Sequence, residues 1–390
     1  MTSATTVAGN VVPTQHDTTA TTNRTVRIGV VGAGYWGPNL IRNFAALPNV
    51  ALAMICDLDP RRLHAVGEQY PDVALTTSYQ DLLESDVDAI AIATPVKTHY
   101  ELVKKALLAG KHVLVEKPLT ADVRQAAKLL ALAEERGLLL MVDHTMVLSP
   151  AVRKLAELVR SGELGEIWHV SMERLALGLF RRDVNVLWDL APHDISVLLE
   201  VLGEQPIATS ARGACHVQPG IQDVAYVELR FPGNVMAHVH VSWLDPGKVR
   251  RMTIIGSKKM AILDDVAEDK LRVFDRGVDT VEENGRPQLV YRFGDAESVD
   301  LPKDEPLGQQ CAQFVNCIVT GSWSPAYAEQ GLNVVRILEQ ADCSLQNSGH
   351  REALGWDAAG WQDVLAPVAH DATLMRWPRP VAVLARRMAS

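Results

Sequence analysis

The chain has 390 residues, which at roughly 150 residues per domain predicts about two domains. Hydrophobic residues make up 47% and charged residues 22% of the sequence, so a disordered, collagen-like or small disulfide-rich protein is excluded. The net charge of −9 excludes a general nucleic-acid-binding surface, and no apolar run reaches the 18 or so residues of a membrane span. The 5 cysteines form no C-x-x-C pair and favour a cytoplasmic location.

The two ends of the chain differ from the rest in composition. Residues 1–24 are rich in Thr and Ala and lack the basic start and apolar centre of a secretory signal. We interpret them as a disordered leader. Residues 351–390 are interpreted as a C-terminal extension without an assigned function, and no cysteine or histidine spacing in the chain predicts a metal site.

A glycine-rich loop follows the first patterned strand. Val26–Val31 is a β-branched run, and it is followed by Gly32-Ala33-Gly34-Tyr35-Trp36-Gly37 and a segment that can continue as a helix. In this context G-x-G-x-x-G is the fingerprint of dinucleotide binding. Gly32 permits the tight turn, Gly34 lets the backbone approach a pyrophosphate, and Gly37 lets the helix pack against the strand. The cofactor-binding residues expected here are Gly32, Gly34, Tyr35, Trp36 and Gly37.

The residue that ends the next strand indicates which cofactor, NAD or NADP, is preferred. Ala51–Cys56 is apolar and ends at Asp57, 20 residues after Gly37, where a carboxylate is expected to bind the adenosine ribose 2′-hydroxyl. A carboxylate would repel a 2′-phosphate, so NAD is favoured over NADP. Arg61 and Arg62 follow closely and are interpreted as solvated residues of the next helix.

Strands and helices continue to alternate, which predicts an α/β Rossmann domain with a parallel sheet over residues 25–145. Ligands of such sheets bind at the carboxyl ends of the strands. Polar residues end three of the strands and are expected to line the nicotinamide end of the cofactor site: Thr94-Pro95 with His99, Glu116-Lys117-Pro118, and Asp143-His144.

From residue 146 the pattern changes. A helix is predicted after Ser149, and Val235–Trp243 alternates apolar and polar residues with a period of two. Further strand candidates lie next to one another in the chain, which predicts an α+β domain with a large, mostly antiparallel open sheet over residues 146–350. Few helices are predicted to cover this sheet, so we expect the chain to self-associate through it.

One predicted helix carries a carboxylate and an imidazole four residues apart, Asp189 and His193. With Pro192 in the first helical turn, the two side chains lie on one side of the helix, and the dipole favours the neutral imidazole that a general base needs. Asp189 would orient His193 or bind substrate. Alternatively, Asp189 is only the N-cap and His193 an exposed first-turn residue. Asp194 is interpreted as a first-turn carboxylate that stabilises the dipole.

Together, the glycine loop, Asp57, Glu116-Lys117-Pro118 and the Asp189–His193 pair resemble the Gfo/Idh/MocA family of NAD(P)-dependent oxidoreductases, over about residues 26–349. The segment 185–196 resembles the branch that contains UDP-N-acetylglucosamine 3-dehydrogenases. The resemblance implies a homodimer or homotetramer that transfers a hydride between nicotinamide and a ring alcohol, at C3 of a nucleotide-activated or otherwise modified sugar. An inositol, cyclitol or glycoside dehydrogenase is an alternative, and so is a non-catalytic NAD-binding regulatory protein.

The resemblance also implies catalytic roles. Lys117 would stabilise the developing alkoxide and help to relay its proton, His193 would be the base, and Asp189 would hold the substrate or His193 in place. Oxidation of a secondary alcohol needs such a base beside a hydride acceptor. A cis peptide is implied before Pro118.

Several polar residues near the predicted helix are expected to contact the substrate. Arg181 and Arg182, in a chain of net charge −9, favour an anionic group such as a diphosphate, although both could instead be solvated loop residues. The expected substrate-binding residues are Asn185, Arg174, Arg181, Arg182 and His144.

One segment departs from the branch. Where the branch commonly reads Gly-His-Thr-Phe-Leu-Tyr-Asn-Pro, this chain has Asp143-His144-Thr145-Met146-Val147-Leu148-Ser149-Pro150. The tyrosine and asparagine expected near the substrate are missing, so the substrate of one relative does not carry over. The catalytic lysine, aspartate and histidine are all present, which favours an active enzyme.

Overall fold

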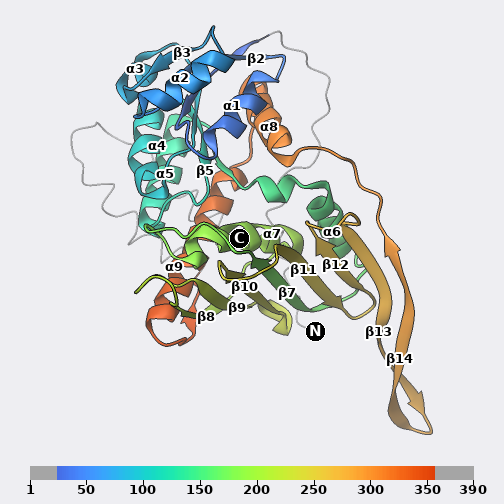
Figure 1. The fold of residues 1–390 in the computed structure, drawn as a ribbon. Helices are drawn as coiled ribbons and strands as arrows, with labels where there is room; N and C mark the ends of the chain where they lie inside the picture. The colour runs from blue at the N-terminus through green and yellow to red at the C-terminus, as the bar shows by residue number, and fades with distance from the viewer. Residues whose placement is uncertain (1–23, 356–390) are drawn as a thin grey trace. The chain divides into compact units, whose positions relative to one another are not determined.

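The computed structural model describes residues 24–355 (Figure 1). All but the last residue of the predicted leader at 1–24, and most of the predicted extension at 351–390, therefore lie outside the described residues. Within the described range, no helix is both long enough and apolar enough to cross a bilayer.

The chain divides into two compact units. The first contains the described residues up to Thr145, together with Glu305–Arg336 and Gly355. The second contains Met146–Asp304 and Ile337–Leu354. Each unit is built on a sheet of its own.

The first unit contains a six-stranded sheet in the order β3-β2-β1-β4-β5-β6, and every neighbouring pair is parallel. Its strands are β1 (Val26–Val31), β2 (Val50–Cys56), β3 (Ala74–Thr76), β4 (Ala89–Ile92), β5 (His112–Glu116) and β6 (Leu140–Asp143). All of β4 and most of β1 are buried, which explains their nearly continuous apolar sequences. The predicted parallel Rossmann sheet is confirmed, and its order reverses between β1 and β4, a switch point of the kind at which such sheets bind ligands.

Helices connect these strands. They are α1 (Gly37–Ala45), α2 (Pro60–Gln69), α3 (Tyr79–Glu84), the short η1 (Val96–Thr98), α4 (His99–Leu108) and α5 (Val123–Arg136). Asp59 and Asp122 cap α2 and α5 by accepting hydrogen bonds from first-turn backbone N–H groups, as short polar side chains do at helix starts. The short elements β3 and α3 were not predicted from the sequence.

A further helix of the first unit, α8 (Pro306–Thr320), was not predicted. Phe314 packs edge-on against Phe44 of α1, with the ring centroids 6.4 Å apart. At the start of α8, both carboxylate oxygens of Glu305 accept hydrogen bonds from the Arg42 guanidinium. Figure 1 shows α8 beside α1, although more than 250 residues separate them in the chain.

The second unit contains a nine-stranded sheet in the order β14-β13-β12-β11-β7-β10-β9-β8-β15. Only β7 and β10 pair in parallel, so the sheet is mixed but mostly antiparallel, as predicted. Its strands are β7 (Ile167–Leu175), β8 (Ala208–Ala214), β9 (Val224–Arg230), β10 (Met236–Ser242), β11 (Val249–Gly256), β12 (Met260–Asp264), β13 (Leu271–Glu283), β14 (Arg286–Ser298) and β15 (Glu352–Ala353).

Two helices of the second unit, α6 (Pro150–Arg160) and α7 (Val186–Leu202), pack against each other and against this sheet. The period of two predicted for β10 is confirmed, because Ala237, Val239 and Val241 are buried and the residues between them are partly exposed. The long helix α9 (Ala326–Gln346) contributes its residues from 337 onward to this unit.

Helix α7 begins earlier than predicted. The Asn185 side chain caps it by accepting a hydrogen bond from a first-turn backbone N–H at 3.2 Å. Pro192 therefore lies inside the helix, and the placement of His193 and Asp194 in the first turn is wrong. Asparagine is a strong N-cap, and 11 of the helix residues are buried, which outweighs the unfavourable interior proline. The helix dipole acts mainly on the terminal turn. The predicted effect of the dipole on the His193 imidazole therefore does not apply.

Strands β13 and β14 form a long hairpin (Figure 1). Asn284 and Gly285 form its turn with φ values of 54° and 72°, the positive values that a two-residue turn matching the strand twist needs. Leu289, Tyr291 and Phe293 alternate along β14, and each is more than 60% exposed. The hairpin thus carries an apolar face that the described residues leave uncovered.

Candidate active site

The glycine loop joins β1 to α1 in the geometry that a dinucleotide requires. A Cβ on Gly37 would lie 1.9 Å from the Gly32 carbonyl oxygen, so no side chain fits there. Among the described residues, a Cβ on Gly34 would meet the Arg62 guanidinium, at 3.4 Å, and no backbone. A pyrophosphate can therefore approach the backbone closely at Gly34. Among the described residues, no side chain caps α1, and the first turn of α1 contains no acidic residue. Its N-terminal N–H groups are therefore suited to a pyrophosphate, and the residues present fit NAD or NADP.

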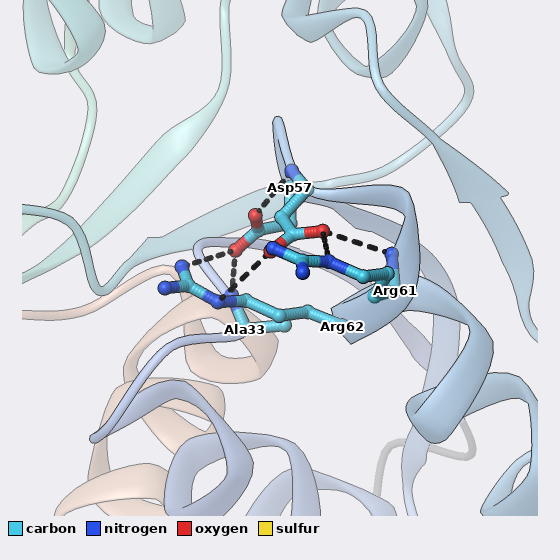
Figure 2. A network of polar contacts seen from close by, with 5 residues as sticks. Ala33, Asp57, Arg61 and Arg62 are labelled. Carbon is cyan, nitrogen blue, oxygen red and sulfur yellow. Dashed lines mark hydrogen bonds and ion pairs between the residues drawn. The ribbon is translucent and has the colours of Figure 1, made fainter.

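Asp57 organises this loop, as Figure 2 shows. One carboxylate oxygen accepts a hydrogen bond from the Ala33 N–H at 2.7 Å, and the other accepts one from the Asp59 N–H at 2.8 Å. Arg62 Nη1 lies 3.6 Å from the first of these oxygens. Arg61 binds the Asp59 carboxylate and lowers the pKa of Asp59 to about 2. Arg62, interpreted from the sequence as solvated, is half exposed but lies beside the predicted ribose ligand.

The ends of β4 and β5 are tied together by His99. Its Nδ1 lies 2.9 Å from the Pro118 carbonyl oxygen and its Nε2 lies 2.8 Å from that of Thr94. Burial lowers the pKa of His99, and only 1% of the residue is exposed. The Lys117–Pro118 peptide is cis, as the resemblance implied. His99 thus holds in place the two backbone segments that carry Lys117 and Pro95.

Within the first unit, the charge of Lys117 acts on the polar side chains of Glu116 and His144. Glu116 and Asp143 end the neighbouring strands β5 and β6 in matched register. His144 is 2% exposed, and burial followed by the charge of Lys117 lowers the pKa of His144 to about 3. The His144 imidazole is therefore neutral at physiological pH.

Within the second unit, Asp189 lies in the first turn of α7. The Trp243 indole N–H donates to one Asp189 carboxylate oxygen at 3.1 Å, and Arg181 Nε lies 3.6 Å from the other. Because Asn185 holds the N-cap position, the alternative that Asp189 is the N-cap is wrong. Asp189 and His193 are both helical and four residues apart, so they face one side of α7.

Two residues expected to contact the substrate have partners inside the second unit. Arg174 is 8% exposed and donates two hydrogen bonds to Asp194, at 2.8 and 3.0 Å. Besides capping α7, Asn185 donates to Gln222 at 3.1 Å and to Asp342 at 3.0 Å. We assign Arg174 and Asn185 to holding α7 in place. Asp194, interpreted from the sequence as a first-turn carboxylate, is instead the ion-pair partner of the buried Arg174.

The structure therefore divides the predicted site residues between the two units. The first unit brings Lys117, Glu116 and His144 together, and the second brings Arg181 to Asp189. Arg182 is exposed. Trp243 was not predicted as a partner of Asp189. The sequence indicates only an apolar residue at the end of a predicted strand.

Comparisons with known proteins identify the class to which this fold belongs. Residues 26–144 match a model described as an oxidoreductase family with an NAD-binding Rossmann fold, and residues 152–262 match the GFO/IDH/MocA C-terminal domain. The chain belongs to the Gfo/Idh/MocA family and is an oxidoreductase.

Its relatives include enzymes of sugar metabolism. UDP-N-acetylglucosamine 3-dehydrogenase of Acidithiobacillus ferrooxidans is 31% identical over 75% of this chain and 88% of its own length. A crystal form of that enzyme has a TM-score of 0.71 at 28% identity, over 83% of this chain and 98% of the other. The dTDP-3,4-didehydro-2,6-dideoxy-alpha-D-glucose 3-reductase of Streptomyces antibioticus is 29% identical over 76% of this chain and 89% of its own.

Proposed function

We propose that this protein is an NAD-dependent oxidoreductase that moves a hydride between nicotinamide and a ring secondary alcohol, at C3 of a nucleotide-activated or otherwise modified sugar. The observation that carries the proposal is the presence of Lys117 at the end of β5 and of Asp189 and His193 on one side of α7, in a chain similar along most of its length to enzymes named for reactions at C3 of nucleotide sugars.

In this mechanism each residue has a separate task. The Lys117 ammonium stabilises negative charge on the alcohol oxygen, and His193 takes the hydroxyl proton as general base. Asp189 holds the substrate or the imidazole and is itself oriented by the Trp243 indole N–H. When bound, nicotinamide supplies the hydride acceptor.

The proposed substrate carries an anionic group such as a diphosphate. Arg181 supports this, because its side chain is 51% exposed and only one carboxylate, that of Asp189, lies within 4.0 Å of it among the described residues. Arg182 is exposed beside it. Arginine binds phosphate oxygens through paired hydrogen bonds.

Asp57 makes NAD the proposed cofactor and NADP the less suitable one. We expect Asp57→Asn to lower kcat/KM for NAD by about 10–100-fold, because a charged hydrogen bond to the ribose contributes roughly 1.5–3 kcal/mol. The same change removes the negative charge that repels a 2′-phosphate and leaves Arg62 free to bind one, so relative use of NADP rises. Steady-state kinetics with both cofactors measure the ratio. The matched variant Asp57→Asn/Arg62→Ala should lose the gain with NADP, and an unchanged ratio in Asp57→Asn would contradict the assignment.

The function is tested with the purified full chain. Cofactor released by denaturation is identified, and absorbance of the reduced nicotinamide is then followed with UDP-sugars, dTDP-sugars, free sugars, inositols and glycosides. Turnover confined to nucleotide-linked sugars supports the proposal. Turnover confined to cyclitols or glycosides identifies the alternative dehydrogenases. Tight NAD binding without any turnover indicates a regulatory protein and overturns the enzymatic proposal.

We also propose that the protein is cytoplasmic and forms a homodimer or homotetramer through the open sheet. The five cysteines are free, in keeping with a reducing compartment. Tyr226 is 54% exposed on the sheet and stacks on His240, with ring centroids 4.1 Å apart. We expect light scattering to give the mass of two or four chains for the wild type and a lower mass for Tyr226→Arg. A monomeric wild type would contradict this.

A further inference from the structure

Two carboxyl groups lie side by side at the carboxyl edge of the parallel sheet. Glu116 is the last residue of β5 and Asp143 is the last residue of β6, and the two are paired in register. Register partners on neighbouring parallel strands point to the same face, and the strands lie only about 4.8 Å apart. Asp143 is 1% exposed, and Glu116 Oε1 is shielded from solvent. Two carboxylates in such surroundings repel each other strongly unless they share a proton.

The hydrogen-bond donors around the pair indicate where that proton lies. Asp143 accepts a hydrogen bond from the Thr145 hydroxyl at 2.6 Å and a long one from the Trp36 indole N–H at 3.4 Å. Glu116 Oε1 is buried and has no hydrogen-bond partner among the described residues, and burial followed by the Asp143 charge raises the pKa of Glu116 well above its usual range. We therefore expect Glu116 to be the member of the pair that holds the proton.

Lys117 is a cation whose charge acts on Glu116. The Lys117 charge acts on Glu116 in the opposite direction from burial, lowering the pKa of Glu116. His144 is neutral near physiological pH, since the pKa of His144 is about 3. On α8, Cys311 remains a thiol because burial and then the Asp143 charge raise the pKa of Cys311.

Two further charged groups, one on α1 and one at the start of α8, lie near Cys311. Arg42 and Glu305 both act electrostatically on Cys311. They form an ion pair with each other, and their opposite charges largely cancel. Among the described residues, Lys117 is the cation whose charge acts on Glu116.

We propose that Glu116 and Asp143 form a carboxylic acid–carboxylate pair that holds one proton and presents a single negative charge to Lys117. Both are positioning residues, because they act on the reaction through the Lys117 ammonium. The pair is formed by the last residues of the neighbouring strands β5 and β6. Its effect on catalysis rests on the proposed function, whereas the shared proton does not.

Infrared spectroscopy of the full chain tests the proton directly and needs no substrate. We expect the carbonyl stretch of a buried protonated carboxyl in the wild type near neutral pH, its loss in Glu116→Gln, and its loss at lower pH in Asp143→Asn than in the wild type. Glu101→Gln, which alters an exposed carboxyl on α4, is the matched control and should leave the band in place. Absence of any band sensitive to Glu116→Gln would overturn the proposal.

Thermal unfolding as a function of pH provides a second readout. Because the pKa of Glu116 is raised in the folded state, the folded chain binds this proton more tightly than the unfolded chain. The wild type should therefore lose stability, relative to Glu116→Gln, as the pH rises from the usual glutamate range towards the raised pKa of Glu116. Parallel curves for the two proteins would contradict the shared proton.

The pH profile of turnover tests the action on Lys117. The double variant Glu116→Gln/Asp143→Asn removes the negative charge of the pair at every pH, so we expect the alkaline limb of kcat to move to lower pH by about 1–3 units. An alkaline limb that stays in place while the infrared band changes would overturn the positioning role. If no sugar is turned over but the band behaves as expected, the proposed function fails and the shared proton is supported.

Discussion

Replacing Lys117 with alanine is expected to lower kcat by about 10²–10⁴-fold, the range lost when a charge-stabilising or proton-transferring group is removed. Lys117 follows β5 directly, and its charge acts on Glu116, His99 and His144. No other lysine directly follows a strand of the parallel sheet in the described part of the chain. Initial rates measured by absorbance of the reduced nicotinamide check this result.

A surface lysine serves as the matched control. Lys154 lies on α6, where it forms an exposed ion pair with Glu157 at 2.9 Å, and such pairs contribute at most about 1 kcal/mol to stability. Lys154→Ala should leave kcat unchanged. If Lys117→Ala retains wild-type kcat while it still binds NADH, measured by fluorescence, Lys117 has no catalytic role.

The largest effect on stability is expected at the buried ion pair of the second unit. Arg174 and Asp194 join β7 to α7 through two hydrogen bonds, and their side chains are 9% and 4% exposed. Arg174→Met should lower the free energy of unfolding by about 3–5 kcal/mol, because it leaves the Asp194 carboxylate buried without its partner. For a unit of this size, that corresponds to a fall of roughly 6–20 °C in Tm.

The double variant Arg174→Met/Asp194→Leu distinguishes the lost charge pairing from lost packing. Replacing both partners of a buried ion pair by apolar residues is often nearly neutral, so the double variant should regain most of the lost Tm. Denaturation followed by circular dichroism measures all three proteins. Equal instability of the single and double variants would show that packing by Arg174, and not its charge, holds α7.

Much of the cofactor site was predictable because local sequence controls it. The spacing of Gly32, Gly34 and Gly37 predicted a loop in which a Cβ at Gly37 clashes with the backbone. The apolar run before Asp57 predicted a buried strand, and Asp57 lies at its end, beside the loop. Side-chain periods follow from backbone geometry, so they can be read without knowing the fold.

The start of α7 shows how local reasoning failed. Proline near a helix start is common, and Pro192 was therefore placed in the first turn. The packing of α7 against β7, β9 and β10, together with the Asn185 cap, extends the helix through that proline. The predicted dipole effect on His193 was lost with the shift, whereas the four-residue spacing from Asp189 remained.

By itself the sequence determined the two kinds of sheet, the glycine loop, Asp57 and the positions of Lys117, Asp189 and His193 along the chain, because each depends on neighbouring residues. Only the tertiary structure decided which charged groups meet. Arg42 pairs with Glu305 across 263 residues, Arg174 pairs with Asp194, and Glu116 meets Asp143 through strand register. Burial strengthens such interactions and makes unpaired charges unfavourable, and burial is a property of the packed chain, which no local pattern specifies.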